Sequence, residues 1–322
     1  MPAQPIPVPI PETMVAVRLH SYGGPESLVY ETVPVPQPSD QEVLIRVQAA
    51  GVNPADWKIR EGYLKEAFPL SLPMVPGSDV AGVIVAVGKE VSYLKVGEHV
   101  YGLADMSRSG AYGQYAIAHS GAVSHKPGSL TAVEAASVPV AALTAWQALK
   151  DAAHIQPTDK ILIHGAGGMV GLFAVQFACR FGCHIVAMTS HDSIHLVREM
   201  GADTVMDYAK LDFEHHISGI DIVFDTIGGE IQERSWQTLK PGGILVTTTA
   251  PPSQETADSH DVRARMLQMQ PSAFQLNDIA QWLNTGELRT FVGKLFILEQ
   301  AAEAQEAQRL QHIRGKVVLS VA

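Results

Sequence analysis

A glycine-rich segment, HGAGGMVG at residues 164–171, is the part of the sequence best suited to chemistry. A short apolar strand is predicted before it at 161–164, and apolar residues at helical spacing predict a helix over 168–181. The pyrophosphate of a dinucleotide binds the free N–H groups at a helix N-terminus, where the helix dipole is positive. A Cβ in the turn would block that approach, so glycine is needed there. The predicted cofactor contacts come from Gly165, Gly167, Gly168, Met169, Val170 and Gly171.

The spacing of these glycines departs from the strict G-x-G-x-x-G fingerprint, because Val170 occupies the position of the third glycine. The spacing Gly165-x-x-Gly168-x-x-Gly171 is met instead, and Gly171 is then expected to allow close packing of the helix on the strand. The alternative is a glycine-rich turn that binds no ligand. The flanking strand and helix favour the cofactor interpretation.

The end of the next predicted strand, at 184–188, bears on which dinucleotide is bound. NAD sites usually carry an Asp or Glu about 20 residues after the glycine turn, which bonds the ribose 2′-hydroxyl. Here Thr189 and Ser190 follow the strand, and the first carboxylate is Asp192. Hydroxyls and a cation suit a 2′-phosphate, and Thr189, Ser190 and His195 could supply them, although His195 could equally lie on a solvated helix face. We therefore expect NADP(H) rather than NAD.

The wider pattern of elements places this turn in a two-domain chain. From residue 160 onward, predicted strands and helices alternate, which indicates a Rossmann-type, doubly wound parallel sheet of the α/β class. Before residue 131, short β-rich runs punctuated by Gly and Pro predict a mostly β domain of barrel type. The predicted parts are a flexible proline-rich tail at 1–13, a catalytic domain from 14–138 plus 286–322, and a dinucleotide-binding domain at 139–285.

Composition narrows the possible partners. The 322 residues carry 23 Lys plus Arg and 33 Asp plus Glu, a net charge of −10 that disfavours nucleic acid. No apolar run of membrane-spanning length is evident, and the first residues have neither the basic nor the apolar region of a signal peptide. Two cysteines, Cys179 and Cys183, cannot form a disulfide framework or a four-cysteine zinc site. We expect a cytoplasmic protein with a small-molecule substrate and no membrane or nucleic-acid partner.

Several segments in a fixed order carry a family resemblance. They are GVNPADWKIREG (51–62), VPGSDVAGVIVAVG (75–88), LTAWQAL (143–149), HGAGGMVGLFAVQFA (164–178), GADTVMDY (201–208), DTIGGE (225–230), LKPGGILV (239–246) and HIRGKVVLSV (312–321). From residue 14 onward the chain resembles the zinc-independent quinone oxidoreductases of the medium-chain dehydrogenase/reductase superfamily. The resemblance implies a mostly β, GroES-like barrel catalytic domain around an inserted Rossmann domain, an active site in the cleft between them, and a homodimer.

Two positions in these segments separate the chain from its zinc-dependent relatives. In those relatives, the segment that matches GVNPAD carries a cysteine ligand, and the segment that matches PGSD carries a histidine ligand. Here Asn53 and Ser78 occupy these places, and neither is a zinc ligand of the usual His or Cys type. The resemblance therefore implies a site without a metal.

The resemblance also implies roles for individual residues. Asn53 and Thr144 line the nicotinamide and substrate site. Ser190 and His195 match positions that hold the 2′-phosphate, and Tyr208 matches one that packs near the adenosine phosphate. The resemblance also implies that Thr226, Thr247 and Thr248 lie on loops that pass the nicotinamide. It implies a contact between a cofactor phosphate and either Arg314 or Lys316.

The implied chemistry follows from the lack of a strong Lewis acid. Quinones and α,β-unsaturated carbonyls are already electrophilic, so hydride from NADPH can reach them when both are held in a near-attack geometry. The Asn53 amide and Tyr63 are the candidate donors to the developing oxyanion, with water as the candidate proton source. Two alternatives stay open: an NADPH-binding redox sensor or scaffold with little turnover, and an enoyl-thioester reductase.

Overall fold

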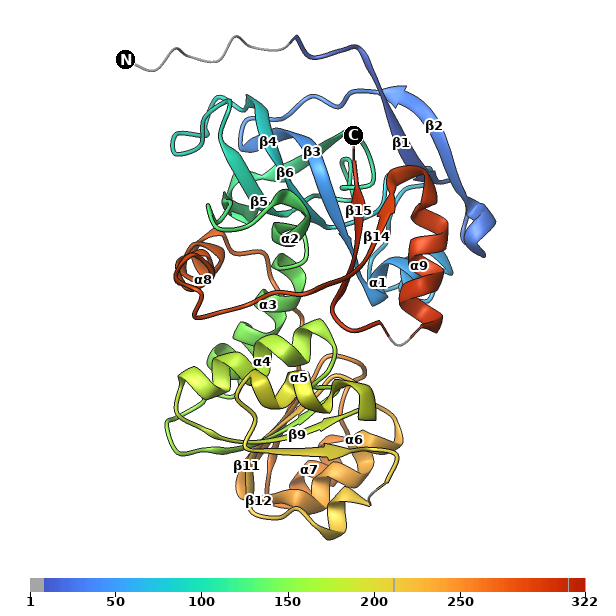
Figure 1. The fold of residues 1–322 in the computed structure, drawn as a ribbon. Helices are drawn as coiled ribbons and strands as arrows, with labels where there is room; N and C mark the ends of the chain where they lie inside the picture. The colour runs from blue at the N-terminus through green and yellow to red at the C-terminus, as the bar shows by residue number, and fades with distance from the viewer. Residues whose placement is uncertain (1–8, 211, 312, 322) are drawn as a thin grey trace. The chain divides into compact units, whose positions relative to one another are not determined.

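The structure is a computed structural model that describes residues 9–210, 212–311 and 313–321 of the chain (Figure 1). The chain forms two compact units, the first from residues 1–140 and 271–322 and the second from residues 141–270. The second unit is therefore inserted in the first, as the resemblance implied. Most of the predicted proline-rich tail lies outside the described residues, and the first strand begins at Thr13.

Unit 1 contains a seven-stranded, mostly antiparallel sheet in the order β14-β15-β3-β4-β5-β7, with β6 paired to β3. A two-stranded sheet pairs β1 with β2, and side chains from both sheets pack into one apolar core. The mostly β domain predicted from the sequence is thereby confirmed. Its strands are β1 (Thr13–Leu19), β2 (Leu28–Pro34), β3 (Glu42–Val52), β4 (Asp79–Val87), β5 (His99–Leu103), β6 (Tyr115–His119), β7 (Val123–His125), β14 (Val292–Ile297) and β15 (Lys316–Ser320).

The helices of unit 1 connect and cover these strands. Pro54 opens the first of them, where the missing N–H is no loss because first-turn N–H groups have no helical partner. This helix packs on the last one through Arg60, which bonds Gln305 at 3.1 Å and Glu306 at 2.7 Å. The helices are α1 (Pro54–Arg60), α2 (Ala132–Ala135), α8 (Ala273–Thr285), α9 (Ala301–Leu310) and α3 (Pro139–Trp146), which runs on into unit 2 and a π-helical turn at Gln147–Ala152.

Unit 2 contains a six-stranded sheet in the order β10-β9-β8-β11-β12-β13, and every strand pair in it is parallel. The strand order reverses at β8, and Figure 1 shows α4 and α5 on one face of the sheet with α6 and α7 on the other. This is the predicted doubly wound arrangement. Its elements are β8 (Lys160–His164), β9 (His184–Thr189), β10 (Thr204–Asp207), β11 (Ile220–Asp225), β12 (Leu239–Thr247), β13 (Arg263–Met266), α4 (Met169–Arg180), α5 (Ile194–Glu199), α6 (Glu230–Ser235) and α7 (Gln254–Ser259).

The second domain boundary was predicted at residue 285 and lies instead at 270, because α8 belongs to unit 1. Its buried residues include Leu276 and Leu283. The carbonyl of Leu276 accepts a hydrogen bond from Tyr101 Oη at 2.6 Å, and that of Leu283 accepts one from Ser129 Oγ at 3.1 Å. An amphipathic pattern shows that a helix buries one face, but it does not show which domain receives that face.

One helical run, residues 132–152, is long and apolar enough to cross a membrane by length and composition, which corrects the expectation that no such run exists. It comprises α2, α3 and the π-helical turn. In the structure, 78% of its most apolar 18-residue window is buried inside the protein. A core helix passes the same test of length and composition, so the run is weak evidence for a membrane span.

Candidate cofactor and active site

The turn after β8 has a backbone that only glycine accepts easily. Gly165 has a φ of +72°, in the left-handed region. A Cβ at this position would also lie 2.3 Å from Thr226 Oγ1, whose hydroxyl donates to the carbonyl of His164 at 2.9 Å. The ends of β8 and β11 therefore approach closely where the strand order reverses. Ligands of doubly wound sheets bind at such a switch point.

Two further glycines of the turn are required by the packing of the protein itself. A Cβ on Gly171 would lie 2.3 Å from the carbonyl oxygen of Gly165 and 2.5 Å from the Cα of Ala166. Gly171 thus allows the helix to lie close to the turn that follows β8, whereas the prediction placed this close contact between helix and strand. A Cβ on Gly167 would lie 2.5 Å from Thr189 Oγ1, so this glycine lets the turn contact the end of β9.

Gly168 differs from these glycines because the protein leaves space beside it. It is the exposed N-cap of α4 with a φ of −78°, and a Cβ there would meet only the carbonyl oxygen of Gly165, at 3.5 Å. Among the described residues no side chain caps this helix, and its first turn contains no acidic residue. The N–H groups of Met169, Val170 and Gly171 belong to that first turn, where no helical acceptor is available. A pyrophosphate fits these donors, because the missing Cβ keeps their approach open.

The end of β9 carries the residues predicted to select NADP(H). Thr189 is buried, with its hydroxyl beside Gly167. Ser190 is half-buried and precedes a short 3-10 turn, and His195 is exposed on α5. The structure therefore places Thr189 against the glycine turn, and it leaves the side chains of Ser190 and His195 more open to solvent.

The structure adds Asp207 and Lys210, two residues that the sequence analysis missed at this edge. Asp207 ends β10 and lies opposite Thr189 in the parallel pairing. Its Oδ2 lies 3.7 Å from His191 Nδ1 and 3.6 Å from Lys210 Nζ, and the Lys210 side chain is 65% exposed. Tyr208, also exposed, donates its N–H to the carbonyl of Thr189 at 3.2 Å. Aligning the ends of adjacent parallel strands would have found Asp207, because the pairing of β10 with β9 brings it opposite Thr189.

The loop after β11 is organised by Asp225, which is fully buried. One carboxylate oxygen accepts two backbone N–H groups of the following loop at 2.9 Å each. The other accepts from Gln232 Nε2 and from Thr247 Oγ1, both at 3.2 Å. The Thr247 hydroxyl is thus engaged inside the protein, as that of Thr226 is with the carbonyl of His164. That the loops carrying Thr226, Thr247 and Thr248 pass the nicotinamide stays a prediction.

His164, at the end of β8, supports the turn from behind. It is buried, its Nε2 lies 2.9 Å from Ser235 Oγ, and its ring meets that of Phe213 edge-on at 4.8 Å. Burial lowers the pKa of His164 to about 4. The ring is therefore neutral at neutral pH, and its contacts are structural.

Unit 1 holds Asn53 in a buried polar cluster with Asp79 and Lys316. Asn53 follows β3, while Asp79 opens β4 and Lys316 opens β15, and both of these strands pair with β3. Lys316 Nζ donates to Asn53 Oδ1 at 2.5 Å and to Asp79 Oδ2 at 2.7 Å, and Asn53 Nδ2 donates to Asp79 Oδ2 at 2.9 Å. The phosphate contact predicted for Lys316 is wrong in this structure, because its ammonium is buried and paired with a carboxylate.

A second carboxyl group holds the backbone of Asn53. Asp56, on α1, is buried, and its Oδ2 accepts from the Asn53 N–H at 2.7 Å and from Tyr112 Oη at 2.9 Å. Burial raises the pKa of Asp56 to about 6, against the opposing effect of these hydrogen bonds. Both the backbone and the side chain of Asn53 are therefore fixed by buried groups.

Tyr63 and Thr144 complete the predicted catalytic set. Tyr63 is 69% exposed, beyond the C-terminal end of α1, and its ring packs edge-on to Trp57 at 6.1 Å. Asn53 lies at the other end of this seven-residue helix, and the role of Tyr63 as a candidate donor stays a prediction. Thr144 is buried on α3, in unit 2. Across the part of the chain that the structure describes, no three His, Cys, Asp or Glu side chains gather as a metal site.

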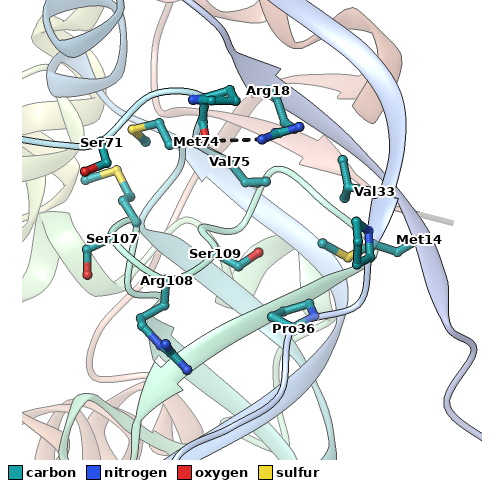
Figure 2. Close-up of a pocket in the computed structure, with 13 residues that line it drawn as sticks. Met14, Arg18, Val33, Pro36, Ser71, Met74, Val75, Ser107, Arg108 and Ser109 are labelled. Carbon is teal, nitrogen blue, oxygen red and sulfur yellow. Dashed lines mark hydrogen bonds between the residues drawn. The ribbon is translucent and has the colours of Figure 1, made fainter.

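A pocket of about 200 Å³ in unit 1 is separate from all of these residues (Figure 2). It lies between β1, β2 and the loops at 71–75 and 106–109. Both of its arginines already have partners: Arg18 bonds Glu31 and the carbonyl of Pro73, each at 3.3 Å, and Arg108 pairs with Glu42 at 3.3 Å. None of the predicted site residues lines this pocket.

Comparison with protein families gives two matches that together span both units. The alcohol dehydrogenase GroES-like domain matches residues 39–146, and the zinc-binding dehydrogenase family matches residues 200–319. The second match does not include residues 53 and 78, the positions where the resemblance places zinc ligands. The first match lies almost entirely in unit 1, whereas the second covers the later part of unit 2 and the C-terminal part of unit 1.

Individual proteins are similar over most of the chain. The mitochondrial NAD(P)H oxidoreductase RTN4IP1 of Danio rerio is 30% identical, with 87% of this chain and 84% of that protein covered. The structure of the quinone oxidoreductase from Coxiella burnetii has a TM-score of 0.89 at 30% identity and covers 96% of this chain and 100% of its own. A mycobacterial protein complexed with NADPH has a TM-score of 0.85 at 26% identity, with 95% and 99% covered.

Proposed function

Since the chain belongs to the quinone oxidoreductase-like members of the medium-chain dehydrogenase/reductase superfamily, we propose that it transfers hydride from NADPH to a quinone or an α,β-unsaturated carbonyl. The observation that carries the proposal is the open N-terminus of α4. There the glycine turn leaves backbone N–H groups uncapped by described side chains, and Gly168 leaves space for a pyrophosphate. When bound, the nicotinamide supplies the hydride, and the protein binds and orients the reactants.

Four observations at the adjoining ends of β9 and β10 support NADPH over NADH. Ser190 offers a hydroxyl there, and His195 is exposed one helical turn further on. The carboxylate of Asp207, which would repel a 2′-phosphate, is faced by His191 and Lys210. Lys210 is the exposed ammonium at this edge and is suited to a phosphate oxygen.

The proposed substrates follow from the side chains at the two positions matched to zinc ligands. An amide at Asn53 and a hydroxyl at Ser78 are poor zinc ligands compared with Cys and His. Without a Lewis acid, the substrate itself must be electrophilic, which quinones and enones are. Asn53 Nδ2 is the proposed donor to the substrate oxygen on which negative charge develops. The proton that completes the reduction comes from water.

The test uses the purified full chain. NADPH and NADH are titrated by cofactor fluorescence, and turnover is followed with 1,4-naphthoquinone, an alkenal and an enoyl thioester. We expect the NADPH Kd to be at least about tenfold lower than that for NADH, and turnover of the quinone or the alkenal. Absence of NADPH binding would refute the cofactor assignment. Tight binding without turnover would favour the sensor alternative, and preference for the thioester would favour the enoyl-thioester reductase.

The homodimer and the cytoplasmic location remain proposals that follow from the resemblance and the composition. Analytical ultracentrifugation at micromolar protein tests the first. A mass of twice 34.6 kDa is expected for the dimer, and a species of 34.6 kDa would contradict it.

A further inference from the structure

Two oppositely charged groups hold the Asn53 amide in one orientation. Its Oδ1 accepts from the Lys316 ammonium at 2.5 Å, and its Nδ2 donates to Asp79 Oδ2 at 2.9 Å. An ammonium only donates hydrogen bonds, and an ionised carboxylate only accepts them. A flipped amide would place its NH₂ against the ammonium and its oxygen against the carboxylate. The couple formed by Asp79 and Lys316 therefore selects one of the two amide orientations.

The backbone around Asp79 and Lys316 leaves space for the Asp79 carboxylate and donates a hydrogen bond to it. A Cβ on Gly51 would lie 2.8 Å from Asp79 Oδ2 and 2.4 Å from the carbonyl oxygen of Ala136. The second carboxylate oxygen, Asp79 Oδ1, accepts the N–H of Val140 at 2.7 Å. Val140 lies in the first turn of α3, the helix that carries Thr144. One carboxylate thus holds Asn53 and also the start of the helix that carries a second predicted active-site residue.

Fold stability alone is a weak reason for such a couple. The Asp79 side chain is 0% exposed and that of Lys316 is 6% exposed, so both charges have lost their water. Well-packed apolar residues in place of a buried ion pair are often neutral or stabilising. The hydrogen bonds that Lys316 and Asp79 form with the Asn53 amide indicate a more specific role for the ion pair, which is to orient that amide.

We propose that Asp79 and Lys316 are positioning residues, which hold the Asn53 amide so that its second Nδ2–H is a ready donor to the carbonyl oxygen of the substrate. This inference rests on the proposed function through the role of Asn53. Hydrogen bonding of Lys316 to Oδ1 polarises the amide and strengthens its N–H groups as donors. The substrate gains two electrons with the hydride, negative charge develops on its oxygen, and water supplies the proton. A donor that is already oriented stabilises that charge without reorganisation.

A double-mutant cycle on kcat tests the inference. Lys316→Met removes the ammonium at similar side-chain length, and the pair Asp79→Leu with Lys316→Met removes both charges, so that no buried charge is left unpaired. We expect each to lower kcat with 1,4-naphthoquinone by about tenfold or more, with the NADPH Kd within about twofold of wild type. In an Asn53→Ala background, the same substitutions should change kcat by less than about twofold, because they act through Asn53.

Two results of this cycle would overturn the inference. One is a loss of kcat that persists undiminished in the Asn53→Ala background, as a general structural defect would produce. The other is a rise of about tenfold in the NADPH Kd for Lys316→Met, which would restore the lysine as a phosphate ligand.

A measurement on the amide itself does not depend on turnover. The chain has only three asparagines, Asn53, Asn277 and Asn284, so ¹⁵N-asparagine labelling yields three side-chain amide pairs. The Asn53 pair is assigned by its loss in Asn53→Ala, and we expect slow exchange with deuterium because the group is buried and bonded. The paired Asp79→Leu, Lys316→Met variant should lose that protection. If the paired variant retains slow exchange at the Asn53 amide, Asp79 and Lys316 do not hold that amide and the inference is wrong. If the wild-type protein shows no turnover, the proposed function is wrong instead.

Discussion

Gly168 offers a substitution that separates cofactor binding from folding. Its φ of −78° and ψ of 163° suit alanine, and a Cβ there would meet only the Gly165 carbonyl oxygen, at 3.5 Å, an ordinary contact. Gly168→Ala should therefore change the free energy of unfolding by less than about 1 kcal/mol, because the smaller loss of backbone entropy and the weaker preference of alanine for the N-cap oppose each other. The added methyl would occupy the open space at the N-terminus of α4.

Gly171→Ala is the matched control three residues along the same helix. Its Cβ would lie 2.3 Å from the carbonyl oxygen of Gly165 and 2.5 Å from the Cα of Ala166. These are backbone atoms, which cannot rotate away as a side chain can, so the helix must shift from the turn. We expect this variant to lose about 2–3 kcal/mol of unfolding free energy.

The two variants are compared in binding and in stability. A methyl that blocks the pyrophosphate should raise the NADPH Kd of Gly168→Ala by about 10- to 100-fold, equivalent to about 1.4–2.8 kcal/mol. Fluorescence titration gives the Kd, and urea unfolding followed by circular dichroism gives the stability. If Gly168→Ala folds like wild type and binds NADPH with an unchanged Kd, the N-terminus of α4 does not hold the pyrophosphate and the reasoning fails.

Further predictions concern pH, cofactor choice and domain structure. Because the pKa of His164 is lowered in the folded protein, the unfolded chain binds a proton more readily than the folded chain between about pH 6.5 and 4. The free energy of unfolding therefore falls as the pH drops through that window, by up to about 3 kcal/mol. Asp56 acts oppositely, since its raised pKa gives stability that is present below about pH 3.8 and lost as the pH rises through 6. His164→Gln removes only the first effect, so its urea midpoint should rise relative to that of wild type as the pH drops from about 6.5 to 4, and parallel profiles would contradict this. Lys210→Met should raise the NADPH Kd about tenfold and leave that of NADH unchanged, unlike the exposed control Lys89→Met; equal effects on both cofactors would exclude a 2′-phosphate contact. Tyr101→Phe should lower the unfolding free energy by about 1 kcal/mol through loss of the bond to Leu276 on α8, and unchanged stability would argue against that bond.

Local sequence was sufficient to predict the dinucleotide turn and the sheet around it. The apolar run of β8, the turn and the helical spacing of α4 are consecutive in the chain. The requirement for glycine at residue 165 is a backbone angle, and at residue 171 it is contact with a residue six positions earlier. Such constraints involve near neighbours, so residue type and spacing express them directly.

Only the tertiary structure decided which distant side chains meet. Strand pairing puts Asp207 beside Thr189 and buries Lys316 with Asp79 and Asn53, which turned a predicted phosphate ligand into the partner of a carboxylate. Packing likewise assigned α8 to unit 1. An amphipathic helix, a lysine or an aspartate shows in sequence that it needs a partner. The identity of that partner depends on strand order and register across many residues of chain, which local pattern does not contain.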